Sequence, residues 1–283
     1  MVLLSLKDTV KKYGLMAKKS LGQNFLLDMN ITQKIIRESL NKQNKNNFSD
    51  TNVVEIGPGP GGLTRAILEN KPCSLTVIEM DERCIEIMRE LSEETDININ
   101  IIEGDALKQN FIGMTETPRQ IVSNLPYNIS VPLLTMWLKN AGYYEALTLM
   151  FQKEVADRIL AEPGSKSYGR ISIFAQLTCK VIRLFDINPN SFVPAPKIWS
   201  TVLLFQPIKN QPKEEELDML ERLTALAFGQ RRKMLRQSLK SIKNISEILL
   251  SCEISSDLRA ENLSPQQYLS LAKTIISQGI SVQ

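Results

Sequence analysis

The chain has 283 residues, of which 43% are hydrophobic and 23% charged, which is enough apolar material for a sizeable core. Its 34 Lys and Arg against 31 Asp and Glu leave a net charge of +3, which excludes an acidic tail or a histone-like polycation but allows a local basic patch. The sequence contains no histidine, so it has no Ser-His-Asp or Cys-His relay and no His-ligated metal.

The four cysteines form no C-x-x-C pair, which disfavours a metal or iron–sulfur site and predicts reduced thiols. No apolar run approaches the roughly 20 residues that a membrane span needs. The lysine-bearing N-terminus lacks the apolar stretch of a secretory signal. We therefore expect a cytoplasmic protein without a metal or a membrane contact. Because no heptad repeat is present, we expect a monomer.

The predicted elements begin with an amphipathic helix around residues 31–40, which Asp28 can cap, followed by a polar loop over 41–52. Short apolar strands then alternate with helices. The strands are predicted at 53–56, 74–78, 98–102, 120–122 and 146–150, and the helices at 63–70, 82–91 and 131–140. The stretches 181–185 and 200–205 can complete the sheet. This alternation predicts an α/β fold with a parallel, doubly wound, Rossmann-like sheet that binds ligands at the carboxyl ends of its strands.

The strand–helix alternation stops near Pro207, and residues 207–213 contain two prolines that are typical of a linker. Beyond the linker the pattern is helical throughout, with helices predicted at 215–228, 231–243, 245–251 and 265–278. We therefore expect two domains. Residues 1–207 would form the sheet domain with an N-terminal extension, and residues 208–283 a small all-helical domain.

Three successive strand ends carry residues suited to a nucleoside. Gly57, Gly59 and Gly62 fit a G-x-G-x-x-G turn, in which the backbone can approach a ligand closely. Glu79, after the next strand, can accept both hydroxyls of a ribose, and Asp105, after the third, can accept the exocyclic amine of adenine. NAD and S-adenosylmethionine share this nucleoside, so these residues alone do not distinguish the two.

The fourth strand ends in Asn124-Leu125-Pro126-Tyr127, which is the most specific signal in the chain. When an exocyclic amine attacks a sulfonium methyl, positive charge develops on the nitrogen, and acceptors aimed at its two hydrogens stabilise that charge. The Asn124 side chain and the Leu125 carbonyl can serve as these acceptors. Pro126 fixes the turn, and Tyr127 offers a stacking face for a base pulled out of its helix. None of these roles needs a histidine.

These four residues are similar to the (D/N/S)-P-P-(Y/F) motif of methyltransferases that act on exocyclic amines. Further segments, in the same order along the chain, resemble the ribosomal RNA adenine dimethyltransferases. The segments are KKSLGQNFL at 18–26, SFVPAPK at 191–197, FGQRRKML at 228–235 and RAENLS at 259–264. The segment at 191–197 resembles the F-x-P-x-P-K-V motif of this family, except that Ile198 replaces the usual Val.

The resemblance implies an enzyme that uses S-adenosylmethionine to dimethylate N6 of two adjacent adenosines near the 3′ end of small-subunit (16S) rRNA. Its substrate would be a pre-30S particle, which gives it a role in small-subunit biogenesis. The implied cofactor contacts are Asn24, Leu26, Gly57, Gly59, Glu79, Asp105 and Asn124. The implied catalytic residues are Asn124, Leu125, Pro126, Tyr127 and Phe192, of which Phe192 would stack on the target adenine opposite Tyr127.

A basic run without an acidic residue lies between Gly229 and Lys243. If residues 231–243 are one helix, Arg232, Arg236 and Lys240 share a face that can meet RNA phosphates. The predicted RNA-binding residues are Arg231, Arg232, Lys233, Arg236 and Lys240, and the N-terminal lysines at 11, 12, 18 and 19 can extend this track.

Other functions remain open from the sequence. A large-subunit adenine methylase of the macrolide-resistance type would share the cofactor site, but the 228–235 and 259–264 segments favour the small-subunit branch. A DNA adenine methylase is less favoured. The protein could also be an RNA-binding assembly factor for which methylation is secondary. A nicotinamide dehydrogenase would leave the Asn124–Tyr127 motif and the basic run unexplained.

Overall fold

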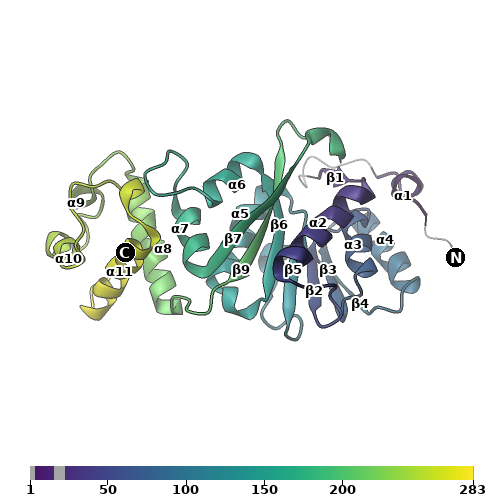
Figure 1. The fold of residues 1–283 in the computed structure, drawn as a ribbon, viewed down its shortest axis with the longest axis horizontal. Coiled ribbons are helices and arrows are strands. Elements are labelled where there is room, and N and C mark those ends of the chain that lie inside the picture. Colours follow the sequence, from purple (N-terminus) through teal and green to yellow (C-terminus); the bar gives the residue numbers. More distant parts are fainter. Residues whose placement is uncertain (1–3, 16–22, 283) are drawn as a thin grey trace. The chain divides into compact units, whose positions relative to one another are not determined.

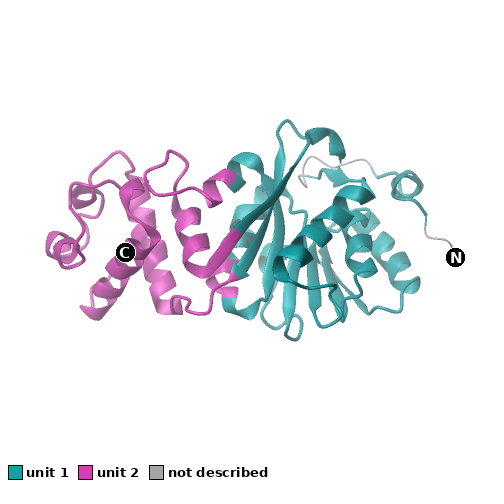
Figure 2. Cartoon of the chain, in the orientation of Figure 1, with its two compact units in different colours: residues 1–136, 142–156, 182–206 teal, residues 137–141, 157–181, 207–283 magenta. Residues whose placement is uncertain are grey.

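The computed structural model describes residues 4–15 and 23–282 of the chain. The chain forms two compact units, which Figure 2 colours teal and magenta. Unit 1 comprises residues 1–136, 142–156 and 182–206, and unit 2 comprises residues 137–141, 157–181 and 207–283. Unit 2 thus contains the predicted helical region and adds two earlier segments to it. The functional division at 207/208 stays a prediction.

Unit 1 is built on a seven-stranded sheet in the order β4-β3-β2-β5-β6-β9-β7 (Figure 1). The neighbours from β4 to β6 pair in parallel, as expected. The strands are β2 (Asn52–Ile56), β3 (Ser74–Glu79), β4 (Ile99–Glu103), β5 (Arg119–Ser123), β6 (Ala146–Gln152), β7 (Cys179–Ile187) and β9 (Ser200–Pro207).

The expectation of an entirely parallel sheet is wrong at β9, which runs antiparallel to β6. The connection from β7 to β9 contains only the 3-10 turn η4 (Pro189–Ser191) and the two-residue strand β8 (Phe192–Val193). Strand β9 lies between β6 and β7 in the sheet. To run parallel to β7 it would need a crossover connection, usually a helix, and this connection has none. The α/β Rossmann-like class is nevertheless confirmed.

Helices in unit 1 begin and end close to their predicted positions. They are α2 (Met29–Gln43), α3 (Gly62–Glu69), α4 (Glu82–Glu93) and α5 (Tyr127–Lys139). Asp28 caps α2, as expected, by accepting from the backbone N–H of Asn30, and Asp81 caps α4 in the same way through Arg83. The apolar sides of α2, α3 and α4 pack on the sheet in a continuous core. The caps and this packing fix where each loop at the sheet edge begins.

A small two-stranded sheet was not anticipated. Strand β1 (Phe25–Leu26) pairs antiparallel with β8, so that Leu26 lies opposite Phe192. The N-terminal helix α1 (Leu6–Lys12) precedes β1 and is capped by Ser5. Residues 16–22, which include most of the segment resembling K-x-x-G-Q-(N/H)-F-L, lie outside the described residues. The β1–β8 pair joins two segments that the sequence comparison singled out separately.

Unit 2 is helical. Its helices α7 (Arg170–Thr178), α8 (Glu214–Gly229) and α11 (Pro265–Ser277) pack against one another. The buried rings of Tyr168 and Tyr268 both contact Phe228, and their hydroxyls donate to the backbone carbonyls of Leu263 and Ala260. The other elements are α6 (Lys153–Ile159), which leads into unit 2 from unit 1, α10 (Ile245–Ser251) and the 3-10 turn η5 (Ala260–Asn262).

The single helix predicted over 231–243 is wrong. Only α9 (Leu235–Ser238) forms there, and Met234 before it makes an isolated antiparallel bridge with Arg259. The run has no acidic residue to form i,i+4 pairs, and cations at a helix start oppose the helix dipole. Arg232, Arg236 and Lys240 therefore do not share one helical face. No helix in the described part of the chain is long and apolar enough to cross a membrane.

Candidate active site

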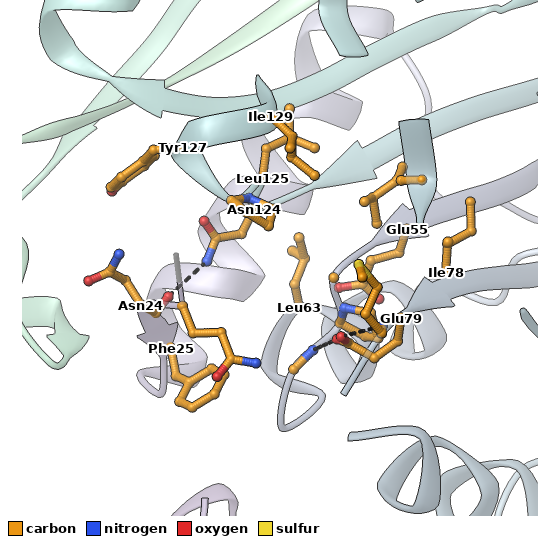
Figure 3. A pocket seen from close by; sticks show the side chains of 18 of the residues that line it. Asn24, Phe25, Glu55, Leu63, Ile78, Glu79, Asn124, Leu125, Tyr127 and Ile129 are labelled. Carbon is orange, nitrogen blue, oxygen red and sulfur yellow. Dashed lines mark hydrogen bonds between the residues drawn. The ribbon is translucent and has the colours of Figure 1, made fainter. Parts of the chain in front are cut away.

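A cavity of about 270 Å³ lies at the carboxyl ends of β2, β3 and β5 and beside the turn after β4 (Figure 3). Its lining comes from four strand ends and from the 23–26 segment, all within unit 1. The predicted site residues that line it are Asn24, Leu26, Gly57, Gly59, Glu79, Asp105, Asn124, Leu125, Pro126 and Tyr127. The structure thus brings together residues that the sequence placed at separate strand ends.

The glycine turn after β2 packs directly against the 23–26 segment. Gly59 has φ +55°, and a Cβ there would lie 3.1 Å from the Phe25 ring. A Cβ on Gly62 would lie 2.6 Å from the backbone carbonyl oxygen of Leu26, too close for any side chain. The glycines therefore allow the turn and the N-terminal segment to approach each other and form one wall of the cavity.

Glu79 joins the turns that follow β2 and β3. Its Oε1 accepts from the backbone N–H groups of Met80 and Asp81 at 2.7 and 3.0 Å, and Oε2 accepts from Gly59 N–H at 3.3 Å. The side chain is buried, and burial raises the pKa of its carboxyl group. Its carboxylate oxygens can still accept from a ribose, because an ionised carboxyl offers about four acceptor sites.

Asp105 begins the 3-10 turn η2 (Ala106–Lys108), and its Oδ1 accepts from the Leu107 backbone N–H at 2.9 Å. Its Oδ2 makes no hydrogen bond within the described residues. Leu107 and Ile129, which also line the cavity, give it apolar walls suited to a flat base. A purine amine is therefore a suitable partner for Asp105.

A hydrogen bond connects Asn124 to Asn24, and both residues line the cavity. The Asn124 side chain donates through Nδ2 to the backbone carbonyl of Asn24 at 3.4 Å (Figure 3). Since the amide nitrogen is used in this way, the amide oxygen is left as the acceptor for a substrate. This contact orients the residue that the sequence assigned to the reacting amine.

Tyr127 stands at the start of α5, where its hydroxyl lies 2.7 Å from Ser200 Oγ. Burial raises the pKa of this phenol, so it stays neutral at physiological pH. The hydrogen bond holds the ring at the edge of the cavity. Tyr127 is therefore well placed to act as a fixed stacking face.

Phe192 is not brought to the cavity. It is only 2% exposed and belongs to the apolar core that includes Phe25 and Leu26. Its partner in the β1–β8 strand pair is Leu26, which does line the cavity. Stacking of Phe192 on a target base stays a prediction, and it requires the ring to leave this core.

Several lining residues were missed by the sequence reasoning. They are Gln23, Phe25, Glu55, Leu63, Ile78, Met80, Leu107 and Ile129 among others. Glu55 carried a usable signal, because a carboxylate inside an apolar strand directly before a glycine turn is unusual. It is 1% exposed, accepts from Thr64 Oγ1 at 2.7 Å, and has its pKa raised by burial to about 8.

The raised pKa of Glu55 predicts a pH dependence of stability. Folding favours the protonated carboxyl, so its contribution is complete below the unfolded pKa and is lost as pH rises toward about 8. We expect Glu55→Gln to remove this loss, with a difference of up to about 1.4 kcal/mol for each pH unit between pH 5 and 8. Urea unfolding of wild type and Glu55→Gln across this pH range measures the difference. If the free energies of unfolding of the two proteins changed equally with pH, the prediction would be wrong.

The predicted RNA-binding residues divide into two groups. Arg231 is half-buried and engaged within unit 2, where it donates to Glu261 Oε2 at 2.6 Å and to the Lys166 carbonyl at 2.7 Å. Arg236 pairs with Asp257. Arg232, Lys233 and Lys240 are exposed, and they form no ion pair within the described residues. The first group is already engaged, so the second is the better candidate for phosphates.

These environments predict different effects of mutation. Arg231→Ala removes the hydrogen bonds of a partly exposed charged group and should lower the free energy of unfolding by about 1 kcal/mol. Lys240→Ala should leave stability unchanged and weaken RNA binding, with the salt slope of log K reduced by about 1. Thermal unfolding and RNA binding at several salt concentrations check both. An unchanged stability in Arg231→Ala would contradict its assignment as a structural residue.

Of the N-terminal lysines, Lys12 pairs with Glu90 at 2.5 Å, while Lys11 is exposed. Lys18 and Lys19 lie outside the described residues. Whether these lysines extend an RNA-binding track stays a prediction.

A Rossmann-like sheet with a glycine turn, a buried carboxylate after β3 and an Asn-x-Pro-Tyr motif after β5 defines a methyltransferase that uses S-adenosylmethionine. The family model for ribosomal RNA adenine dimethylases matches residues 14–277. The chain belongs to this family. It is an rRNA adenine dimethyltransferase, and S-adenosylmethionine is its cofactor.

Individual relatives agree with the family. The chain is 42% identical to the ribosomal RNA small subunit methyltransferase A of Rhodospirillum rubrum, over 97% of this chain and 93% of that one. It is 45% identical to the protein of the same name from Wolbachia sp. subsp. Drosophila simulans, over 94% and 96%.

Solved structures give the same fold. A dimethyladenosine transferase from Plasmodium falciparum matches with a TM-score of 0.75 at 26% identity, covering 90% of this chain and 98% of that one. The 23S rRNA methyltransferase ErmE matches with a TM-score of 0.65 at 22% identity, covering 89% of this chain and 100% of that one. This second match is evidence for the fold only.

The cavity fits the cofactor of this class. The buried Glu79 carboxylate suits a ribose, and the Asp105 turn with its apolar neighbours suits an adenine. The glycine turn and the 23–26 segment together line the cavity with backbone, which suits the methionine part. These residues would hold S-adenosylmethionine, and Asn124 lines the same cavity.

Proposed function

We propose that the protein dimethylates N6 of two adjacent adenosines near the 3′ end of small-subunit (16S) rRNA. The relatives that match nearly the whole chain at 42–45% identity carry the name of small-subunit methyltransferases. The observation that carries the chemistry is the Asn124 amide, whose donor is bonded to Asn24 and whose oxygen is left to receive an amine.

The residues of this chain act by positioning and electrostatics. S-adenosylmethionine, when bound, supplies a methyl group activated by its sulfonium charge. The Asn124 Oδ1 and the Leu125 carbonyl accept from the two hydrogens of the adenine N6. They favour a more tetrahedral nitrogen and stabilise its developing positive charge. Because this nitrogen becomes acidic as its bond to carbon forms, its proton can pass to solvent without a strong base in the site.

Tyr127 supplies the stacking face for the extruded adenine, because its hydroxyl is fixed on Ser200. A fixed face lowers the entropy that is lost when the base is ordered. The second methyl transfer uses the same acceptors, although only one N6 hydrogen then remains to be bound.

The finer aspects of the substrate belong to the same proposal. The substrate is a pre-30S particle, and the protein acts on it as a cytoplasmic monomer without a metal. Residues 208–283 recognise the RNA, with Arg232, Lys233 and Lys240 as its phosphate contacts. The exposure of these three cations supports this role.

Methyl-transfer assays on three substrates, run in parallel, test the proposal. Labelled S-adenosylmethionine is offered with unmethylated small subunits, large subunits and DNA. Transfer to small subunits alone is expected. Transfer to large subunits would instead indicate a methylase of the resistance type. Tight RNA binding with no transfer to any substrate would indicate an assembly factor.

A further inference from the structure

The segment from Phe192 to Ser200 is fixed at both ends beside the cavity. At its start, Phe192 and Val193 pair with β1, whose residues line the cavity. At its end, Ser200 Oγ lies 2.7 Å from the hydroxyl of Tyr127, which lines the cavity as well. The segment therefore runs from one part of the cavity lining to another.

The sheet register places the end of this segment at the active edge. Ser200 lies opposite Gln152, the last residue of β6, so β9 begins at the carboxyl edge of the sheet. The backbone carbonyl of Trp199 accepts from Lys153 N–H at 2.9 Å, and Thr201 Oγ1 donates to Asp186 at 2.7 Å. Together with Pro194 and Pro196, these bonds restrict the backbone on which Trp199 stands.

The side chains of the segment do not resemble those of an ordinary surface loop. Trp199 is 46% exposed, although tryptophan is one of the most costly side chains to leave in water. Val193 and Ile198 are also exposed. Lys197 is exposed and is the only charged residue between 192 and 200, so the segment combines an aromatic face with a positive charge.

We propose that Trp199 is a stacking platform for a nucleobase next to the target adenosine, and that Lys197 binds the adjoining phosphate. An exposed aromatic side chain on a restrained backbone, with a single cation two residues away, has the chemistry that single-stranded RNA-binding surfaces use. This inference rests on the proposed function and adds to it a second base-binding position beside that of Tyr127.

Kinetics on unmethylated small subunits test this role. Trp199→Ala is expected to raise the KM for small subunits about 10-fold, because stacking of one base contributes binding of this order. The kcat and the affinity for S-adenosylmethionine should change little, and Trp199→Phe should retain most of the wild-type KM. The matched control is Tyr143→Ala, which removes a 50% exposed aromatic from η3 (Ala141–Tyr143), the turn that precedes β6.

An optical measurement gives an independent readout. The chain has two tryptophans, and Trp137 is only 1% exposed. A short single-stranded RNA with two adjacent adenosines should quench the emission of Trp199 in the wild type, and Trp199→Phe should lose this quenching. Both readouts are needed because Trp199→Ala could also disturb the fold.

The outcomes separate this inference from the proposed function. An unchanged KM in Trp199→Ala, an equal rise in Tyr143→Ala, or loss of cofactor affinity in Trp199→Ala would overturn the stacking role. Quenching that persists in Trp199→Phe would overturn it as well. If wild type fails to methylate small subunits, the proposed function fails, and the quenching by RNA still decides the role of Trp199.

Discussion

Replacing Asn124 with alanine is expected to lower kcat for methyl transfer by about 100-fold or more, the range found when one donor or acceptor of a preorganised site is removed. The change removes the oxygen that accepts from the adenine N6 and the amide that donates to the Asn24 carbonyl at 3.4 Å. Single-turnover transfer to unmethylated small subunits measures the effect. Cofactor affinity should fall far less than kcat.

Two variants make the Asn124 result specific. Asn124→Asp keeps an acceptor oxygen but loses the donor to Asn24, so we expect activity between that of wild type and Asn124→Ala. Asn100→Ala changes an exposed asparagine on the edge strand β4 and should have no effect. Full activity in Asn124→Ala would show that the motif does not carry the chemistry.

Loss of the Glu79 carboxylate is expected to weaken S-adenosylmethionine binding by about 100-fold or more. Two hydrogen bonds from a ribose to an ionised group are each worth about 1.5–3 kcal/mol. The same change leaves the backbone N–H groups of Met80, Asp81 and Gly59 without their acceptor, which loosens two turns of the cavity. Titration calorimetry of wild type and Glu79→Ala with S-adenosylmethionine measures the change in affinity.

The matched control for Glu79 is Glu86→Ala, which removes an exposed carboxylate from α4 one turn beyond its start. It should bind the cofactor like wild type. If Glu79→Ala bound the cofactor as tightly as this control, the ribose would have another acceptor and the assignment of Glu79 would be wrong. Binding should also weaken as pH falls, because burial raises the pKa at which this carboxyl takes up a proton.

The strand ends of the site could be read from the sequence because each carries a local signal. A glycine turn, a carboxylate or an Asn-x-Pro-Tyr motif directly after an apolar strand is visible without tertiary information. Parallel strands bring their carboxyl ends to one edge, so Gly57, Glu79, Asp105 and Asn124 had to converge. The caps by Asp28 and Asp81 are equally local.

What the sequence did not predict depends on contacts between distant segments. The β1–β8 pair joins residues 25–26 to 192–193, and it buries Phe192 where a substrate-stacking role was expected. Arg231 looks like one more cation in a basic run, yet it is half-buried and paired with Glu261, 30 residues away. The bridge from Met234 to Arg259 ended a helix that local periodicity alone would have continued.

The measurement that tests the central claim most directly maps the product on the RNA. Unmethylated small subunits are incubated with the protein and S-adenosylmethionine, and their rRNA is examined by nucleoside mass spectrometry and by primer extension. Two methyl groups on N6 remove the hydrogens that pair with an incoming base, so reverse transcriptase stops at each product. We predict dimethyladenosine with a stop at two adjacent adenosines near the 3′ end, absent with Asn124→Ala. Monomethyladenosine alone, or stops elsewhere in the RNA, would contradict the account.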